Sequence, residues 1–358
     1  MDIDEYLKLL KSEIKEVVGC TEPASIAYAV AKARQVLEKE ISTPAAEIRR
    51  GLRVELELSS DVSRNVSTVR VPVVRKKGAA PAAACGLFAS PDSFNPFKTI
   101  TNREKKEINS LLEKRNWVDI SSNEKRGVYV KASLHSGLNR VDVIVRGEHD
   151  HVEKIFFNDE LIFQASETKL PRVENLRHAR QIVEKDDGRL KEFVSDFLNR
   201  QSQLIKEIDY DNIIEAVEKV VLQRMEGESI RVQTITGSGN QGIFLGLPLY
   251  QKLNEEGDDF LEAALFTVLV QIYLTHREKR LTDKCGLITK SAPALMAGLL
   301  YYNKKPLELI KKKMELVAES ARGVLCEGAK PSCALKAYMS LSMVEKIESM
   351  EENGAWKF

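Results

Sequence analysis

Four cysteines of this 358-residue chain lie at breaks in helical sequence patterns, and three of them fall toward its C-terminal end. These three are Cys285, Cys326 and Cys333. Gly328 and Pro331 lie between the last two, so that segment cannot form one continuous helix and is predicted to fold as a loop. Both thiols of the loop can then point toward one centre. Cys333 falls in the first turn of the helix opened by Pro331, where free amides and the helix dipole favour a thiolate or an anionic cluster.

Thiolates at helix ends are suitable ligands for an iron–sulfur cluster. Three of them on a four-iron cluster leave one iron open as a Lewis acid. Two alternatives stay open on spacing alone. The thiols can be ordinary buried cysteines, which are common in helical cores. They can also bind zinc, although the six residues between Cys326 and Cys333 match no standard zinc spacing.

The fourth cysteine, Cys20, lies near the N-terminus in the sequence Gly19-Cys20-Thr21-Glu22-Pro23. Thr21 is a candidate helix cap and Pro23 suits a first helical turn, so the pattern predicts a thiol at a helix N-terminus. Such a position depresses the pKa of a thiol. Cys20 is therefore a candidate base or ligand, and the alternative is a thiol packed beneath the helix start.

Two further segments contain groups that could bind a small molecule. The sequence from Gly237 to Gly242 matches G-x-G-x-x-G, but only helical patterns follow it, without the alternating strands of a dinucleotide-binding sheet. We expect its backbone amides and Asn240 to bind a small carboxylate or to neighbour a cluster, with a plain tight turn as the alternative. His149 and His151 follow a predicted strand and could bind a metal or shuttle protons, although His151 is more typical of an exposed loop.

Hydrophobic spacing predicts the elements that position these residues. Helical spacing covers 2–18 and 22–39, and alternation with a period of two then predicts strands around 54–58, 69–73, 128–130 and 141–145. Later helices are predicted over 103–114, 175–184, 188–199, 201–224, 257–279, 290–302, 304–322 and 331–348. The predicted fold class is α+β. Residues 1–45 and 171–358 would form a mostly helical cluster-binding domain, and 46–170 an inserted α/β domain containing an antiparallel sheet.

Composition narrows the function classes. The 54 basic and 53 acidic residues leave a net charge of +1, which argues against nucleic acid and against an anionic membrane surface as partners. There is no apolar run long enough for a membrane span and no signal-like start, so we expect a cytoplasmic protein. Five cysteines in a reducing compartment do not suggest disulfides. Cys85, among alanines, is predicted to be a core residue.

Four stretches together resemble the L-cysteine desulfidase family, which is related to the iron–sulfur L-serine dehydratases. They are Val17 to Ala27, Gly237 to Gly242, Lys284-Cys285-Gly286, and Cys326 to Lys336 with the sequence CEGAKPSCALK. The resemblance extends from end to end of the chain. It implies an oxygen-labile [4Fe-4S] cluster bound by Cys285, Cys326 and Cys333, with Cys20 as catalytic base or reversible fourth ligand. It also implies β-elimination from L-cysteine to sulfide, ammonia and pyruvate.

The resemblance further implies a substrate site, for which the candidates are Thr21, Glu22, His149, Ser238, Gly239 and Asn240. One loop departs from the family pattern, because Glu148-His149-Asp150-His151 replaces Ser-His-Thr-Asn and keeps only the histidine. The two added acids would repel a substrate carboxylate unless basic side chains neutralise them. L-Serine is the second expected substrate, and a non-catalytic cluster-binding sensor is the alternative function. A homodimer is left open by the sequence.

Overall fold

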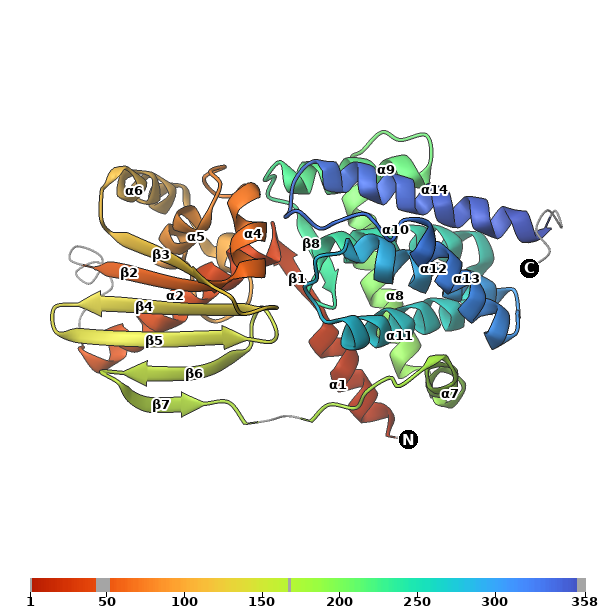
Figure 1. Cartoon of the computed structure of the whole chain (residues 1–358), viewed down its shortest axis with the longest axis horizontal. Helices are drawn as coiled ribbons and strands as arrows, with labels where there is room; N and C mark the ends of the chain where they lie inside the picture. Colours follow the sequence, from red (N-terminus) through yellow and green to blue (C-terminus); the bar gives the residue numbers. More distant parts are fainter. Residues whose placement is uncertain (1, 43–51, 167–168, 353–358) are drawn as a thin grey trace.

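The computed structural model describes residues 2–42, 52–166 and 169–352. A part built on a six-stranded sheet lies beside a mostly helical part, and the N-terminal segment runs between them (Figure 1). This arrangement confirms the predicted α+β class. None of the described helices combines the length and the apolar composition that a membrane span requires.

The first predicted helix is shorter than expected. α1 covers Ile3–Glu13, and the chain then forms a strand, β1 (Ile14–Val18), before α2 (Thr21–Glu40). β1 pairs antiparallel with β8 (Arg231–Ile235), with Ile14 opposite Ile235. The prediction of one helix over 2–18 is therefore wrong at its C-terminal end. Ile14, Val17 and Val18 fit a helical stripe, but their β-branched side chains also suit a strand once a partner strand is present.

The large sheet has the strand order β3-β2-β4-β5-β6-β7. Its strands are β2 (Arg53–Ser59), β3 (Val118–Asn123), β4 (Tyr129–Ser136), β5 (Asn139–Arg146), β6 (Val152–Phe157) and β7 (Glu160–Gln164). β2 and β3 are parallel and the other neighbours antiparallel, so the sheet is mixed and not antiparallel throughout. α2 packs on β4 and β5.

Three of the described helices lie between β2 and β3 in the sequence: α4 (Ser60–Thr68), α5 (Ala79–Gly86) and α6 (Asn102–Glu113). α6 agrees with its prediction, and Cys85 on α5 is buried as expected. The predicted strand at 69–73 is wrong. That segment makes only an isolated bridge between Arg70 and Lys77, and its valines 69 and 71 are buried beside the end of α4. Alternating valines indicated burial there, but no strand in the described part of the chain pairs with them.

The helical part contains α7 (Leu176–Lys185), α8 (Arg189–Ser202), α9 (Ile213–Met225), α10 (Gly239–Glu256), α11 (Leu261–Glu278), α12 (Ala292–Tyr302), α13 (Leu307–Ser320) and α14 (Ser332–Glu352). The predicted helix 201–224 is wrong in its first half, because α8 ends at Ser202 and a short 3-10 turn precedes α9. α10, α11 and α12 carry long runs of buried residues and form the core of this part.

The division into an inserted domain and a domain made of both chain ends stays a prediction. The prediction grouped α2 with the helical domain, but α2 packs against strands β4 and β5 of the large sheet. α1, by contrast, packs against α8 of the helical part. Cys20 lies in the short connection between β1 and α2, where the chain passes from one part to the other (Figure 1).

Candidate functional site

A small cavity of about 110 Å³ lies where loops of the sheet part meet the helical part. All the site residues predicted from the sequence line it: Cys20, Thr21, Glu22, His149, Ser238, Gly239, Asn240, Cys285, Cys326 and Cys333. The structure therefore brings together residues that are more than 300 positions apart in the chain, from Cys20 to Cys333. The cavity has room only for a small ligand.

Two backbone hydrogen bonds hold Cys285 beside Cys326. The Cys285 amide donates to the carbonyl oxygen of Val324 (3.0 Å), and the Cys326 amide donates to that of Asp283 (2.7 Å). Lys284 and Leu325 form an antiparallel bridge between the same two segments. This short ladder fixes two thiols on neighbouring backbones although 40 residues separate them in the sequence.

The loop that leads to Cys333 is docked on α4. Gly328 has φ +101°, and a Cβ atom there would lie 2.7 Å from Thr68 Oγ1 and 2.9 Å from the Arg64 carbonyl oxygen. Thr68 Oγ1 also donates a hydrogen bond to the Ala329 carbonyl oxygen (3.0 Å). Only glycine fits this turn, which explains the break recognised in the sequence. Cys333 follows in the first turn of α14, as predicted.

The donor set of the three thiols is compatible with an iron–sulfur cluster. Among the described residues, no three His, Cys, Asp or Glu side chains converge closely enough to hold one metal ion. A four-iron cluster is larger than an ion, and it takes its thiolates from around a cube. Burial raises the pKa of Cys285 to about 11 and also raises that of Cys333, so metal binding must displace their protons. An all-thiolate donor set suits iron–sulfur or zinc and does not suit magnesium or calcium.

Cys20 differs from its prediction. It is the N-cap residue of α2 but makes no side-chain capping bond, and Thr21 does not cap the helix either. The Cys20 thiol instead donates to Glu22 Oε2 (3.0 Å). Burial raises the pKa of the thiol, and the negative charge of Glu22 raises it further. The expected depression of this pKa is therefore wrong, because desolvation outweighs the positive end of the helix.

Glu22 is a buried carboxylate with several donors. Oε2 accepts from the Cys20 thiol and from Thr21 Oγ1 (3.1 Å), and Oε1 accepts from Asn65 Nδ2 (2.8 Å). Burial alone would raise the pKa of Glu22, but its proximity to His149 and these hydrogen bonds hold the pKa below its usual value. The backbone amide of Glu22 itself also stabilises this carboxylate, so its negative charge is well supported in the buried site.

His149 is buried beside Glu22, and neither ring nitrogen makes a hydrogen bond to the described residues. Its Nε2 lies 3.9 Å from Glu22 Oε1. Burial lowers the pKa of His149, and the positive charge of Arg280 adds to this, against the opposing effect of Glu22. The imidazole is therefore neutral near pH 7 and can accept a proton. His151, two residues on, is exposed, as predicted.

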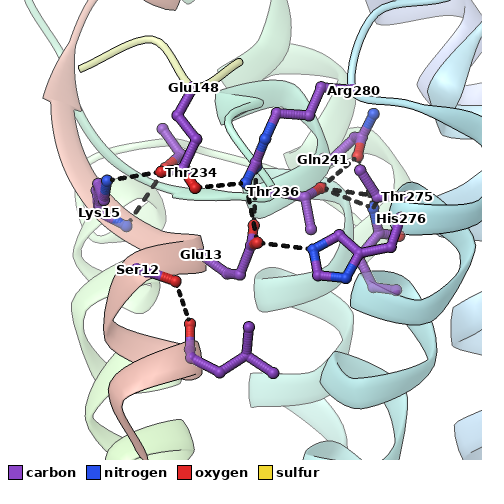
Figure 2. A network of polar contacts seen from close by, with 12 residues as sticks. Ser12, Glu13, Lys15, Glu148, Thr234, Thr236, Gln241, Thr275, His276 and Arg280 are labelled. Carbon is purple, nitrogen blue, oxygen red and sulfur yellow. Dashed lines mark hydrogen bonds and ion pairs between the residues drawn. The ribbon is translucent and has the colours of Figure 1, made fainter. Parts of the chain in front are cut away.

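The two acids next to His149 are neutralised. Lys15 Nζ lies 2.7 Å from Asp150. Lys15 and Arg280 each lie 3.3 Å from Glu148 (Figure 2). Figure 2 also shows Arg280 reaching Glu13, which accepts two hydrogen bonds from it. The departure from the family loop therefore does not leave free negative charge beside the cavity. A substrate carboxylate is compatible with this surrounding.

The glycine-rich segment starts α10. Ser238 is its N-cap and accepts from the Gln241 amide (3.4 Å), and Gly239 and Asn240 form the first turn at the cavity. Among the polar residues of the lining that sequence reasoning missed are Asn65 on α4, Arg224 on α9, and Arg280 after α11. Each is a single polar residue in or after a helical pattern, and no local signal distinguishes it from an exposed one.

Comparison with known proteins places the chain in a family. The chain is 31% identical over 366 residues to a UPF0597 protein of Finegoldia magna, covering 92% of this chain and 85% of that protein. It is 27% identical over 376 residues to an L-cysteine desulfidase of Methanococcus maripaludis, covering 97% and 88%. No solved structure matches it significantly. The serine dehydratase alpha chain profile matches residues 97–351, so the chain belongs to that family.

Proposed function

We propose that this protein is an iron–sulfur-dependent lyase that eliminates the β-substituent of a small L-amino acid. L-Cysteine is the first candidate substrate, giving sulfide, ammonia and pyruvate, and L-serine is the second. Family membership supports lyase chemistry, and the desulfidase relative supports the sulfur substrate. The single observation that carries the proposal is the shared cavity, where three cysteines lie beside a buried carboxylate and a neutral histidine.

Cys285, Cys326 and Cys333 would hold a [4Fe-4S] cluster. When bound, a cluster with one iron free of protein ligands supplies a Lewis acid to the leaving sulfur or oxygen atom. The protein's own groups must do the rest. The buried negative charge of Glu22 at the cavity is the candidate partner of the substrate ammonium group. Elimination removes the Cα proton and breaks the bond from Cβ to the leaving group. The resulting aminoacrylate then takes up water to give pyruvate and ammonia.

The base that takes the Cα proton has two candidates. Cys20, the first candidate from the sequence, is protonated near neutral pH because its pKa is raised, and it donates to Glu22. His149 is neutral and has two free nitrogens in the same cavity. We therefore favour His149 as the base in the cluster-loaded protein. Cys20 keeps its two predicted roles, alternative base and reversible fourth ligand.

Replacing His149 by glutamine is expected to lower kcat/KM about 10²–10⁴-fold, the usual effect of losing a general base. Steady-state kinetics on anaerobically loaded protein measure this effect, with iron content as a check on the cluster. His151→Gln is the matched control and should leave the rate unchanged, because that side chain is exposed outside the cavity. A His149→Gln protein with the wild-type rate would remove His149 from the mechanism.

The pH profile separates the two bases. A histidine with a lowered pKa stays neutral, and so able to accept a proton, at pH values below its ordinary pKa of 6.5. If His149 is the base, kcat/KM should therefore fall only below pH 6.5. A thiol with a raised pKa would become a thiolate only above its ordinary value of 9.0. Activity that instead rises through pH 9 would favour Cys20.

The direct test is turnover. Anaerobically reconstituted protein is incubated with L-cysteine, L-serine and close analogues while sulfide and pyruvate are measured. We expect stoichiometric sulfide and pyruvate from L-cysteine, and a lower rate of pyruvate formation from L-serine. An intact cluster without turnover of any of these would reject the lyase and leave the cluster-binding sensor. Gel filtration of the same sample tests the homodimer, which stays a prediction.

A further inference from the structure

Arg224 is a buried cation at the cavity for which the described residues provide no carboxylate partner within ion-pair distance. It lies at the end of α9, is 2% exposed, and lines the cavity together with the cysteines. Its Nη2 atom makes no hydrogen bond to the described protein. Burying a charge without a counter-ion is costly, so such a group is expected to have an anionic ligand in the working protein.

The protein fixes the pose of this guanidinium. Nε donates to the Gly19 carbonyl oxygen (3.1 Å), and Nη1 donates to Asn240 Oδ1 (2.7 Å). The guanidinium also packs on Gly239, where an added Cβ would lie 2.6 Å from both Cζ and Nη2. Two of the family-like segments, around Cys20 and around Asn240, therefore hold Arg224 in place. A guanidinium held in this way is preorganised for a planar oxyanion.

A second feature beside Arg224 also favours an anion. Gly239 and Asn240 form the first turn of α10, an 18-residue helix. The first amides of a helix have no intrahelical acceptor, and the helix dipole adds positive potential there. The orphan guanidinium nitrogen and the helix N-terminus are independent features, and they meet at the same residues.

The rest of the cavity selects the kind of anion. Its volume of about 110 Å³ suits a small ligand. Glu22, also at the cavity, places a buried negative charge there, which attracts a cation. The positive charge of Arg224 acts on both Cys20 and Cys333, so Arg224 lies near the thiols as well. A small zwitterion with its carboxylate at one end and its ammonium group at the other matches these charges.

We propose that Arg224, with the first turn of α10, binds the α-carboxylate of the amino-acid substrate, while Glu22 binds its ammonium group. This assignment rests on the proposed function only for the choice of an amino acid as ligand. Arg224 is then a substrate-binding residue that turns the Cα–H bond toward His149. The competing role is a hydrogen bond from Nη2 to a sulfide of the cluster.

The test measures binding without turnover. L-Alanine has the carboxylate and the ammonium group but no leaving group, and L-alaninamide lacks the carboxylate. Calorimetric titration of both the iron-free and the iron-loaded protein should show L-alanine binding at least 10-fold more tightly than L-alaninamide. Arg224→Gln should abolish this preference. Arg224→Lys keeps the positive charge but lacks the paired N–H donors of a guanidinium, so it should weaken the preference. Arg231→Gln is the control, because that side chain is exposed on β8.

The same variants are then assayed for turnover and iron. We expect Arg224→Lys to raise KM for L-cysteine about 10-fold or more, with a smaller change in kcat and wild-type iron content. Equal binding of L-alanine and L-alaninamide by the wild type would overturn the proposal, and needs no variant. Loss of iron in Arg224→Lys with L-alanine binding retained would overturn it in favour of the cluster role. Arg224-dependent binding of L-alanine without any turnover would support it while rejecting the lyase.

Discussion

Replacing Cys285, Cys326 or Cys333 by alanine is expected to abolish both iron binding and turnover. Each side chain is proposed as a direct ligand, so the loss should exceed the roughly 10–100-fold effect typical of an outer-shell substitution. Two of the three backbones are tied by the hydrogen bonds at Val324 and Asp283, so the remaining thiols stay in place when one is removed. Iron and acid-labile sulfide per chain, measured after anaerobic reconstitution, give the result directly.

Two other cysteines are the matched controls for this experiment. Cys85→Ala removes a buried thiol that is not part of the cavity lining. This variant should keep full iron content at a stability cost of about 1 kcal/mol. Cys20→Ala should keep the iron if Cys20 is not an essential ligand. Wild-type iron and sulfide in the three ligand variants would make the cluster assignment wrong. Zinc in the wild type would point to the alternative metal.

Glu13→Ala is expected to destabilise the fold by about 3–5 kcal/mol, the cost of removing one partner of a buried ion pair. Glu13 is 2% exposed, and its carboxylate accepts from both terminal nitrogens of Arg280 (2.8 and 2.9 Å) and lies 3.0 Å from His276 Nε2 (Figure 2). Glu13 is the last residue of α1. His276 lies in the last turn of α11, and Arg280 follows that helix. The network therefore joins the N-terminal segment to the helical part.

Denaturant unfolding of the wild type and the variant measures this free energy. Glu5→Ala on the same helix is the control, because Glu5 forms an exposed ion pair with Lys8, and such pairs contribute little to stability. If Glu13→Ala cost no more than Glu5→Ala, the network would contribute nothing to stability.

The same carboxylate predicts a pH dependence. Burial alone would raise the pKa of Glu13, but the hydrogen bond with His276 and the charge of Arg280 hold it below its usual 4.5. A group whose pKa is lowered by folding stabilises the protein fully above pH 4.5, and this stabilisation is lost as the pH falls through the lowered value. Glu13→Gln, which cannot ionise, should show a shallower loss of unfolding free energy below pH 4.5.

Arg280 links this network to the site. It is shared between Glu13 and Glu148, and Glu148 precedes His149. The positive charge of Arg280 also helps to keep the buried imidazole neutral. Glu148 and Asp150, the two acids beside His149, are therefore part of an ion-pair network.

Local sequence patterns determined much of the fold. Long amphipathic helices such as α6 and α13 were predicted within a few residues, because a 3.6-residue apolar stripe repeats over several turns. The breaks at Cys20, Gly328 and Pro331 were also readable, since glycine and proline restrict the backbone wherever they occur. The family resemblance, which depends on the order of the motifs, pointed to the ten candidate residues. All ten line one cavity.

Only the tertiary structure decided features that depend on distant partners. Residues 14–18 became a strand because β8, more than 200 positions later, pairs with them. The direction of the Cys20 pKa was set by burial and by Glu22, which a local reading of the helix N-terminus could not include. Arg224 reached the cavity from the end of α9, and its neighbours Gly19, Gly239 and Asn240 come from other segments. Desolvation and long-range pairing depend on what surrounds a residue in space, and a linear pattern does not contain that information.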